Sequence, residues 1–298
     1  MSTTLSAFGS PSMTAPIRRL LLKHARDAFV SQAKIDREWA RLFYRSAPDF
    51  DKAVAEYEAF VALLRKFDIE IHFLPPDAST TLDALYVRDA ALVARDGVVL
   101  GNMGKADRRA EPAALGAFAE RLGVPVLGAI TDPGRLEGGD VVWLDGQTVA
   151  VGEGYRSNAE GIRQLAHILG DRVDAVIPVP LPHWNGPDDV FHLMSIISPL
   201  ADDLAVVYSR LMPAPFRQRL LARGITLIEV PDEEFDALGC NVLAVAPRRA
   251  VMADGAPQTR ALLEQAGVEV WTYPAAEISH KGLGGPTCLT QPLWRVTG

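Results

Sequence analysis

The sequence predicts an α/β fold built from repeats of about 50 residues. Five polar residues, each in or beside an apolar, strand-like run, recur at nearly constant spacing. They are Asp89, Asp140, His192, Asn241 and Cys288, and successive members lie 51, 52, 49 and 47 residues apart. A fixed period of this size is typical of repeat architectures, in which each repeat is one supersecondary unit. If the units form a ring, the five polar residues converge on its centre.

The composition is that of a soluble globular protein: 298 residues, 48% hydrophobic and 22% charged, enough for a substantial core. A net charge of −7 without a basic stripe argues against nucleic-acid binding. No apolar run approaches ~18 residues, so no membrane span is expected. The first residues lack a secretory pattern. The chain has only two cysteines, too few for a disulfide framework. Together with the missing secretory pattern, this indicates a reducing cytoplasm.

Helices and strands are expected in a recurring order, about three strands to one helix in each cycle. Apolar spacing and capping residues predict helices at residues 30–66, 112–123, 158–170, 213–224 and 258–267. Strands are expected at residues 69–76, twice within 85–103, in a hairpin over 141–152, and at 174–181, 190–197, 204–209, 226–231, 241–247, 249–253 and 268–274. Kelch propellers share the period but contain no helices. Residues 1–14 are expected to be a disordered tail, followed by a single domain over residues 15–298.

Cys288 follows Gly-Gly-Pro-Thr, a turn that can expose the sulfur and bring backbone N–H groups close to a substrate. The alternative is a buried, inert thiol, which is the interpretation we prefer for Cys240. His192 lies in the apolar run VFHLMSII, where it is either a core histidine or the acid–base partner of a thiolate. No histidine pair has zinc-site spacing, so no metal is expected.

Several charged residues are candidates for binding a charged substrate. The turn Glu137-Gly138-Gly139-Asp140 can aim one acid at a cation and the other at backbone, or simply hold two solvated acids. Asp83 and Asp89 flank Arg88, with which either acid can pair. Arginine can grip a carboxylate bidentately or lie solvated on the surface, and the candidates are Arg108, Arg109 and Arg156.

Taken together, these segments resemble the guanidine-modifying superfamily of dimethylargininases, arginine deiminases and amidinotransferases. The resemblance is carried by LYVRDAALV, GKADRRAEP, LEGGDVVWL, VGEGYRSNAEGIRQLAHIL, FHLMS, GCNVLAV and GGPTCL, in this order from about residue 15 to the end. It implies a five-fold pseudo-symmetric α/β propeller of ββαβ repeats around a polar channel. Residues 15–298 would then be one catalytic domain.

The resemblance also implies which residues form the site. The catalytic residues would be Cys288, His192 and Glu137, and the substrate-binding residues Asp89, Asp83, Arg108, Arg156 and Asn241. Cys288 would attack the central guanidinium carbon and form a covalent thiouronium, and His192 would protonate the leaving amine and then activate water. The implied partner is a small guanidino amino acid, with no cofactor and no metal.

The substrate depends on departures from the family pattern. Met194 stands where deiminases and amidinotransferases carry an acid, and the short chain lacks the extra helical domain of deiminases. Both features favour a dimethylarginine dimethylaminohydrolase that releases citrulline and a methylamine. Arg88 and the GGPTC segment fit that assignment less well. The alternatives are an arginine deiminase or dihydrolase, and a silent protein that only binds arginine derivatives. The oligomeric state, including a homodimer, stays open.

Overall fold

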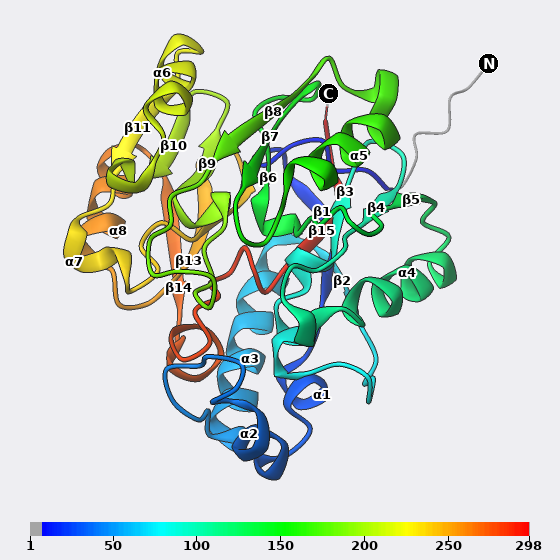
Figure 1. Cartoon of the computed structure of the whole chain (residues 1–298). Coiled ribbons are helices and arrows are strands. Elements are labelled where there is room, and N and C mark those ends of the chain that lie inside the picture. Colours follow the sequence, from blue (N-terminus) through cyan, green and yellow to red (C-terminus); the bar gives the residue numbers. More distant parts are fainter. Residues whose placement is uncertain (1–7, 298) are drawn as a thin grey trace.

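Five three-stranded sheets surround the centre of the molecule, and helices cover the outside (Figure 1). This computed structural model describes residues 8–297. The strands are β1 (Ile17–Leu22), β2 (Glu70–Phe73), β3 (Ala91–Val93), β4 (Val98–Leu100), β5 (Val126–Ala129), β6 (Val141–Trp143), β7 (Thr148–Glu153), β8 (Ala175–Pro180), β9 (Ile197–Ala201), β10 (Leu204–Val207), β11 (Thr226–Glu229), β12 (Val242–Ala246), β13 (Arg249–Ala253), β14 (Glu269–Tyr273) and β15 (Gln291–Arg295). The α-helices are α1 (Ala25–Phe29), α2 (Gln32–Glu38), α3 (Phe50–Leu64), α4 (Glu111–Arg121), α5 (Ala159–Leu169), α6 (Ala214–Ala222), α7 (Asp232–Phe235) and α8 (Pro257–Gln265).

Each sheet has the same internal order, which confirms the ββαβ repeat. In the sheet β3-β4-β5, β3 pairs antiparallel with β4, the chain then passes through α4, and β5 pairs parallel with β4. The sheets β6-β7-β8, β9-β10-β11 and β12-β13-β14 repeat this order, with α5, α6 and α8 as their crossover helices. The fifth sheet is closed by the two ends of the described chain: β15 pairs antiparallel with β1, and β1 pairs parallel with β2.

The five periodic residues occupy the same place in every unit, shortly before its first strand. Asp89 lies in the short helical turn η3 (Val87–Ala90) before β3, and Asp140 ends η5 (Gly138–Asp140) before β6. His192 precedes η7 (Leu193–Ser195), Asn241 directly precedes β12, and Cys288 precedes β15 by a few residues. First strands of different units also contact one another, as β9 does with β12 and β15 with β3. This placement brings the polar residues together.

Local sequence explains the elements that position the site. In α5 the side chain of Asn158 accepts the backbone N–H of Gly161 at 2.9 Å, and the buried Ile162, Leu165 and Leu169 form its inner face. The helix ends at Gly170, whose φ is +50°. The apolar cores lie between such helix faces and the outward sides of the sheets.

The sequence expectations differ from the structure at three places. Residues 190–197 are not one strand: the chain is irregular to His192, turns through η7, and becomes extended only at β9. The helix expected over residues 30–66 is broken into α2 and α3, because residues 39–49 form turns that include Pro48.

The expected disordered tail over residues 1–14 also differs from the structure in its second half. Gly9 donates its backbone N–H to the carbonyl of Leu293 at 2.8 Å, and Ser10 donates to that of Ala94 at 3.0 Å, so residues 8–14 are anchored to the ring. Residues 1–7 lie outside the described part of the chain.

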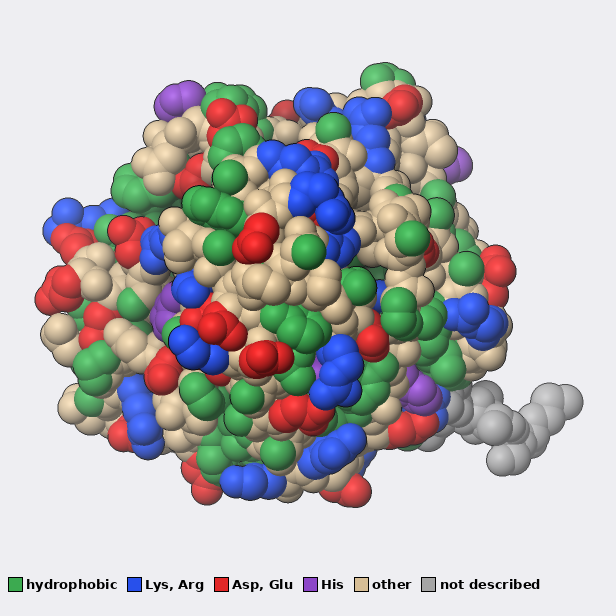
Figure 2. All heavy atoms as spheres, turned by 90° about the horizontal axis from the view of Figure 1, so that it is seen from below, with side chains coloured by type: hydrophobic (Ala, Val, Ile, Leu, Met, Phe, Trp, Pro, Cys, Tyr) green, Lys and Arg blue, Asp and Glu red, His purple; other side chains and the backbone are tan. Residues whose placement is uncertain are grey.

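The surface carries charges of both signs. Figure 2 shows acidic, basic and apolar side chains interspersed over the face seen from below, without a large patch of one sign. Among the described residues, no helix is both long and apolar enough to span a bilayer.

Candidate active site

Two adjoining cavities meet at Cys288 and His192 in the centre of the ring. The larger has a volume of about 250 Å³ and the smaller about 50 Å³. Asp83, Asp89, Arg108 and Arg156 line the smaller cavity, whereas Met194 and Asn241 line the larger one. All eight site residues expected from the sequence except Glu137 therefore face one of the cavities, and Glu137 touches His192 directly. The ring brings together residues that are up to about 200 positions apart.

Asn241 orients the thiol of Cys288. Its Nδ2 donates to Cys288 Sγ at 3.2 Å, and its Oδ1 accepts both the N–H and the hydroxyl of Thr287, at 3.0 and 2.8 Å. A Cβ added to Gly285 would come within 2.5 Å of the Asn241 side chain, so only glycine permits this close approach. Cys288 is partly exposed. Its sulfur faces the cavities, which is consistent with the prediction of an accessible thiol.

The pKa of the Cys288 thiol is raised. Burial and the negative charge of Asp89 oppose the thiolate, and they outweigh the hydrogen bonds from Asn241 and Thr287 and the charge of Arg88. The thiol is therefore neutral in the resting protein near neutral pH. A cation placed beside it would lower the pKa of this group and favour the nucleophilic thiolate.

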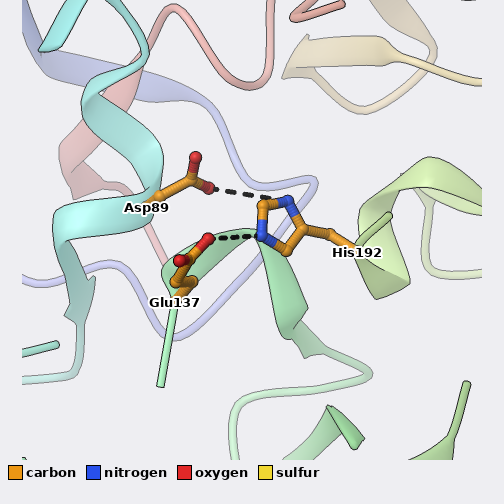
Figure 3. A group of neighbouring side chains, drawn as sticks. All are labelled: Asp89, Glu137 and His192. Atoms are coloured by element: carbon orange, nitrogen blue, oxygen red, sulfur yellow. Dashed lines mark hydrogen bonds and ion pairs between the residues drawn. The ribbon is translucent and has the colours of Figure 1, made fainter. Parts of the chain in front are cut away.

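His192 lies between two carboxylates (Figure 3). Its Nε2 is 2.7 Å from Glu137 Oε2, and its Nδ1 is 3.9 Å from Asp89 Oδ1. Burial alone would lower the pKa of His192, but the charges of Asp89 and Asp140 and the hydrogen bond to Glu137 outweigh it and raise that pKa. The raised pKa favours the protonated imidazole, which can donate a proton.

Glu137 is fully buried and uses both carboxylate oxygens within the chain. Its Oε1 accepts the backbone N–H groups of Gly104 and Lys105 at 3.0 and 3.2 Å, and its Oε2 accepts Arg156 Nη1 at 2.8 Å as well as the proton of His192. Burial would raise the pKa of Glu137, but the charge of Arg156 and the bond to His192 lower it far below its usual range. Glu137 is thus a permanent anion that holds His192 in its charged form.

Asp89 offers the free acceptor of the site. Its Oδ2 accepts Arg108 Nη1, whereas its buried Oδ1 has no hydrogen-bond partner within residues 8–297. A Cβ at Gly139 would lie 2.6 Å from both Asp89 Oδ1 and His192 Nδ1, so glycine is required between them. An unpaired buried carboxylate oxygen costs free energy that an N–H donor from a ligand would recover.

The arginines and Asp83 are engaged with the protein's own groups. Arg108 donates to both oxygens of Glu111, at 2.9 and 2.7 Å, as well as to Asp89. Asp83 accepts Lys105 Nζ at 2.6 Å. Burial raises the pKa of Glu111 to about 7 despite the opposing charge of Arg108. The structure therefore places Arg108, Arg156 and Asp83 at the smaller cavity, each already paired with an oppositely charged side chain.

Arg88 lies behind Cys288. Its backbone N–H donates to the Cys288 carbonyl at 3.2 Å and its Nε to the Thr287 carbonyl at 3.0 Å, while Nη2 has no hydrogen-bond partner among the described residues. It does not pair with Asp83 or Asp89 as the sequence suggested. Arg88 instead fixes the loop that carries Cys288 and supplies a nearby positive charge.

Asp89, Glu137 and His192 also form a group with the side-chain types of a metal site, with ligand atoms within 4.8 Å of one another. Each of these groups is already neutralised by a partner. His192 Nε2 binds Glu137, Arg108 binds Asp89 and Arg156 binds Glu137. A divalent cation would face two arginines there, so the donor set does not favour a metal.

Sequence reasoning missed several residues that shape the site. Lys105 precedes Arg108 in the quoted GKADRR segment, but nothing in the pattern indicated that it pairs with Asp83. Trp184 lines the larger cavity from a loop, and Phe235 lines it from the end of the short helix α7, and neither segment carries a distinctive sequence pattern. Arg109, a candidate beside Arg108, is exposed.

Comparisons with known proteins show the family of the chain. A family model described as N,N-dimethylarginine dimethylhydrolase, eukaryotic, matches residues 33–295. The chain is 31% identical over 249 residues to the N(G),N(G)-dimethylarginine dimethylaminohydrolase of Streptomyces coelicolor, covering 84% of this chain and 89% of that one. It is 28% identical to the enzyme of the same name from Pseudomonas aeruginosa, with coverage of 82% and 89%.

Solved structures share the fold. A cysteine-to-serine mutant of the Pseudomonas aeruginosa dimethylargininase in complex with citrulline superposes with a TM-score of 0.75 at 24% identity, covering 92% of this chain and 98% of that one. An amidinotransferase from Microseira wollei superposes with a TM-score of 0.78 at 14% identity and covers 98% of both chains. The chain belongs to the dimethylarginine dimethylaminohydrolase family of amidine hydrolases within the guanidine-modifying superfamily.

Proposed function

We propose that the protein hydrolyses Nω-methylated arginine to citrulline and a methylamine, with Cys288 as the nucleophile. The observation that carries the proposal is the convergence of the Cys288 thiol, the protonated His192 and the free Oδ1 of Asp89 around one point between two cavities. A guanidinium needs an acceptor for its N–H groups, a nucleophile for its carbon and an acid for its leaving nitrogen.

The reaction follows from the charges at the site. A guanidinium bound to Asp89 Oδ1 brings a positive charge beside Cys288 and offsets the burial that keeps the thiol neutral. The thiol releases its proton to solvent and the thiolate attacks the guanidinium carbon. The bond from that carbon to the methylated nitrogen then breaks, and His192 gives its proton to the departing amine. Neutral His192 then takes a proton from water, the resulting hydroxide attacks the thiouronium carbon, and the C–S bond breaks to leave citrulline.

The smaller cavity suits the amino-acid end of the substrate. It is lined by buried groups of both charges, Asp83, Lys105, Arg108 and Arg156, which complement a zwitterion. Each is paired within the chain, so substrate binding exchanges an internal ion pair for one with the ligand. Met194 lies on the other side of His192 and carries no charge that would demand an unmethylated N–H.

The test is a competition between asymmetric dimethylarginine and arginine, with citrulline, dimethylamine and ammonia measured together. We expect kcat/KM to be higher for the dimethylated substrate. A preference for arginine of about tenfold, equal to about 1.4 kcal/mol in barrier, would assign a deiminase-type activity instead.

Cys288→Ser should abolish turnover with an unchanged Tm, because a serine hydroxyl stays protonated at neutral pH. Full activity in this variant would overturn the thiol mechanism.

A further inference from the structure

The larger cavity is a separate chamber on the leaving-group side of Cys288. Both cavities share Cys288, His192, Asp189, Val190 and Leu283. The buried charged groups that suit an amino-acid zwitterion, Asp83, Arg108 and Arg156, line the smaller one, whereas the larger one has the more exposed Arg45 and Asp236. We propose that the larger chamber admits guanidines whose leaving amine is much bulkier than dimethylamine, namely arginines that carry an uncharged alkyl or arylalkyl substituent on Nω. This inference rests on the proposed function, because it assumes that the amino-acid end occupies the smaller cavity.

The size of the chamber exceeds what methyl groups need. Its volume is about 250 Å³. A methyl group takes up roughly the space of one water molecule, about 30 Å³, so two methyl groups leave most of the chamber unfilled. A substituent of about four to seven carbons would fill it.

The chemistry of the walls favours an uncharged substituent. The apolar side chains in the wall are Trp184, Val190, Phe191, Met194, Phe235, Leu238, Cys240 and Leu283. Trp184 meets Phe235 edge-on at 6.1 Å, and Phe235 stacks on Tyr208 at 4.0 Å, so the aromatic wall is packed from behind. Burial of alkyl surface against such walls is favourable.

Of the three charged residues that line the same chamber, Arg45 and Asp236 are paired with one another, and Asp189 is bonded to a neutral amide. Arg45 Nη1 donates to the carbonyl of Asp236 at 3.1 Å, and its Nη2 is 3.8 Å from the carboxylate of that residue. Asn185 donates to the carboxylate of Asp189 at 2.9 Å. Arg45 and the Asp236 carboxylate are largely exposed, in contrast to the buried Arg108 and Arg156. Exposed pairs of this kind hold a ligand charge weakly, so the chamber has no strong site for an α-carboxylate or an α-amine.

The backbone holds three wall residues in an unusual conformation. Trp184, Leu238 and Leu283 have φ values of +44°, +63° and +63°, a region that large side chains rarely adopt. Such conformations persist where the surrounding structure imposes them, and they gather at functional sites. Here they turn three large apolar side chains toward one chamber.

The chemical step is unchanged by a larger substituent. Cys288 Sγ forms the bond to the guanidinium carbon, the bond from that carbon to the substituted nitrogen breaks, and His192 donates one proton to that nitrogen. The departing alkylamine leaves through the larger chamber while the thiouronium stays on Cys288. Water then completes the release of citrulline as for the methylated substrate.

The experiment compares kcat/KM for asymmetric dimethylarginine, Nω-butylarginine and Nω-benzylarginine, with citrulline and the free amine measured by mass spectrometry. We expect the butyl substrate to react within tenfold of the dimethylated one. Leu238→Trp, which fills the chamber, should lower the butyl-to-dimethyl ratio by tenfold or more. The control is Leu221→Trp, which changes an exposed leucine on α6 outside both cavities and should leave the ratio unchanged.

A second variant covers the event that Leu238→Trp fails to fold. Phe235→Ala removes part of the wall and should raise the benzyl-to-dimethyl ratio threefold or more. The inference is overturned if the butyl substrate is more than tenfold slower than the dimethylated one, or if the folded chamber variants leave the ratios as in the wild type. In both cases the proposed function still stands if the protein hydrolyses dimethylarginine. If dimethylarginine itself yields no citrulline, the proposed function fails and this inference fails with it.

Discussion

At the residue scale, Asp140 links the site to the stability of the fold. It is fully buried, its Oδ1 accepts the backbone N–H of Leu193 at 2.9 Å, and its Oδ2 accepts the hydroxyl of Ser157 at 2.6 Å. Burial raises its pKa to about 6, although His192 and these two hydrogen bonds oppose the rise. The carboxyl group that positions the turn after His192 is therefore ionised at a free-energy cost.

The sign of the pH dependence follows from the direction of this shift. Because the pKa of this carboxyl is higher in the folded protein, protonation favours the folded state. The stabilisation is complete at pH values below the pKa in the unfolded chain, about 3.9, and is lost as pH rises through the pKa in the folded protein. A shift of about two units corresponds to about 3 kcal/mol at neutral pH, as an upper estimate. Asp140→Asn replaces the ionisable carboxyl by a neutral amide of the same shape. The free energy of unfolding of this variant, relative to that of the wild type, should therefore rise as pH increases from 4 to 8.

The measurement is urea unfolding of both proteins across that pH range. Asp171→Asn, which changes an exposed acid, is the matched control and should show a constant difference from the wild type. A constant difference for Asp140→Asn as well would contradict the assignment of a raised pKa to this carboxyl group. The charges of His192 and Glu137 act on Asp140, and the pKa of His192 is raised, so the two curves must be compared over the whole range rather than at one pH.

The identity of the site residues was predictable from the sequence, but their partners were not. Period and resemblance placed Cys288, His192 and Asp89 together, and the structure confirms that they share cavities. The ion pairs of Arg108 with Glu111 and of Arg156 with Glu137 depend on side-chain reach across the ring, which a linear pattern does not encode. The site roles that the resemblance implied remain predictions.

At the scale of the element, the turn η7 holds His192 in place. Ser195 Oγ accepts the backbone N–H of His192 at 3.0 Å, and Asp140 accepts the next N–H, that of Leu193. The sequence suggested a strand here because Val190–Ile197 is almost continuously apolar. The apolar residues reflect burial on several sides, and burial does not distinguish a strand from a tight turn.

Ser195→Ala should reduce kcat more than it reduces stability. The lost hydrogen bond is worth about 1 kcal/mol, or roughly a factor of five in rate if it acts through the position of His192. We expect a three- to tenfold fall in kcat, with KM and Tm nearly unchanged, because the bond fixes a backbone and touches no substrate. Ser195→Thr should restore the rate. A change confined to KM would show that Ser195 contacts the substrate directly instead.

At the scale of the whole molecule, the ring is closed by segments from the two ends of the described chain. Leu20 lies opposite Pro292 and Leu21 opposite Gln291, and Gly9 exchanges backbone hydrogen bonds with Leu293 and Arg295. The number and order of the units were predictable from the period. This closure was implied only by the resemblance to a propeller, since strand pairing between distant segments leaves little local signal.

The closure predicts that the ring tolerates new ends at an outer turn. A circular permutant that joins residues 297 and 8 by a short flexible linker and opens between Asp145 and Gly146, in the β6–β7 turn, should fold and keep its activity. Deletion of residues 1–22, which removes β1, should abolish the cooperative unfolding transition. Circular dichroism melts and citrulline release measure both outcomes, and an inactive but folded permutant would show that the β6–β7 turn matters for the site.

The pairing of β15 with β1 also has a consequence for how the protein is made. A ribosome synthesises β1 first among the strands and its antiparallel partner last, with Ile17 and Arg295 as the outermost partners. Throughout most of translation one edge of β1 has no partner, and the nascent chain does not yet contain Cys288. Cys288 emerges in the same stretch that seals the ring, so the proposed nucleophile and completion of the fold arrive together. Domains generally fold as units during synthesis, and here the last few dozen residues decide both events.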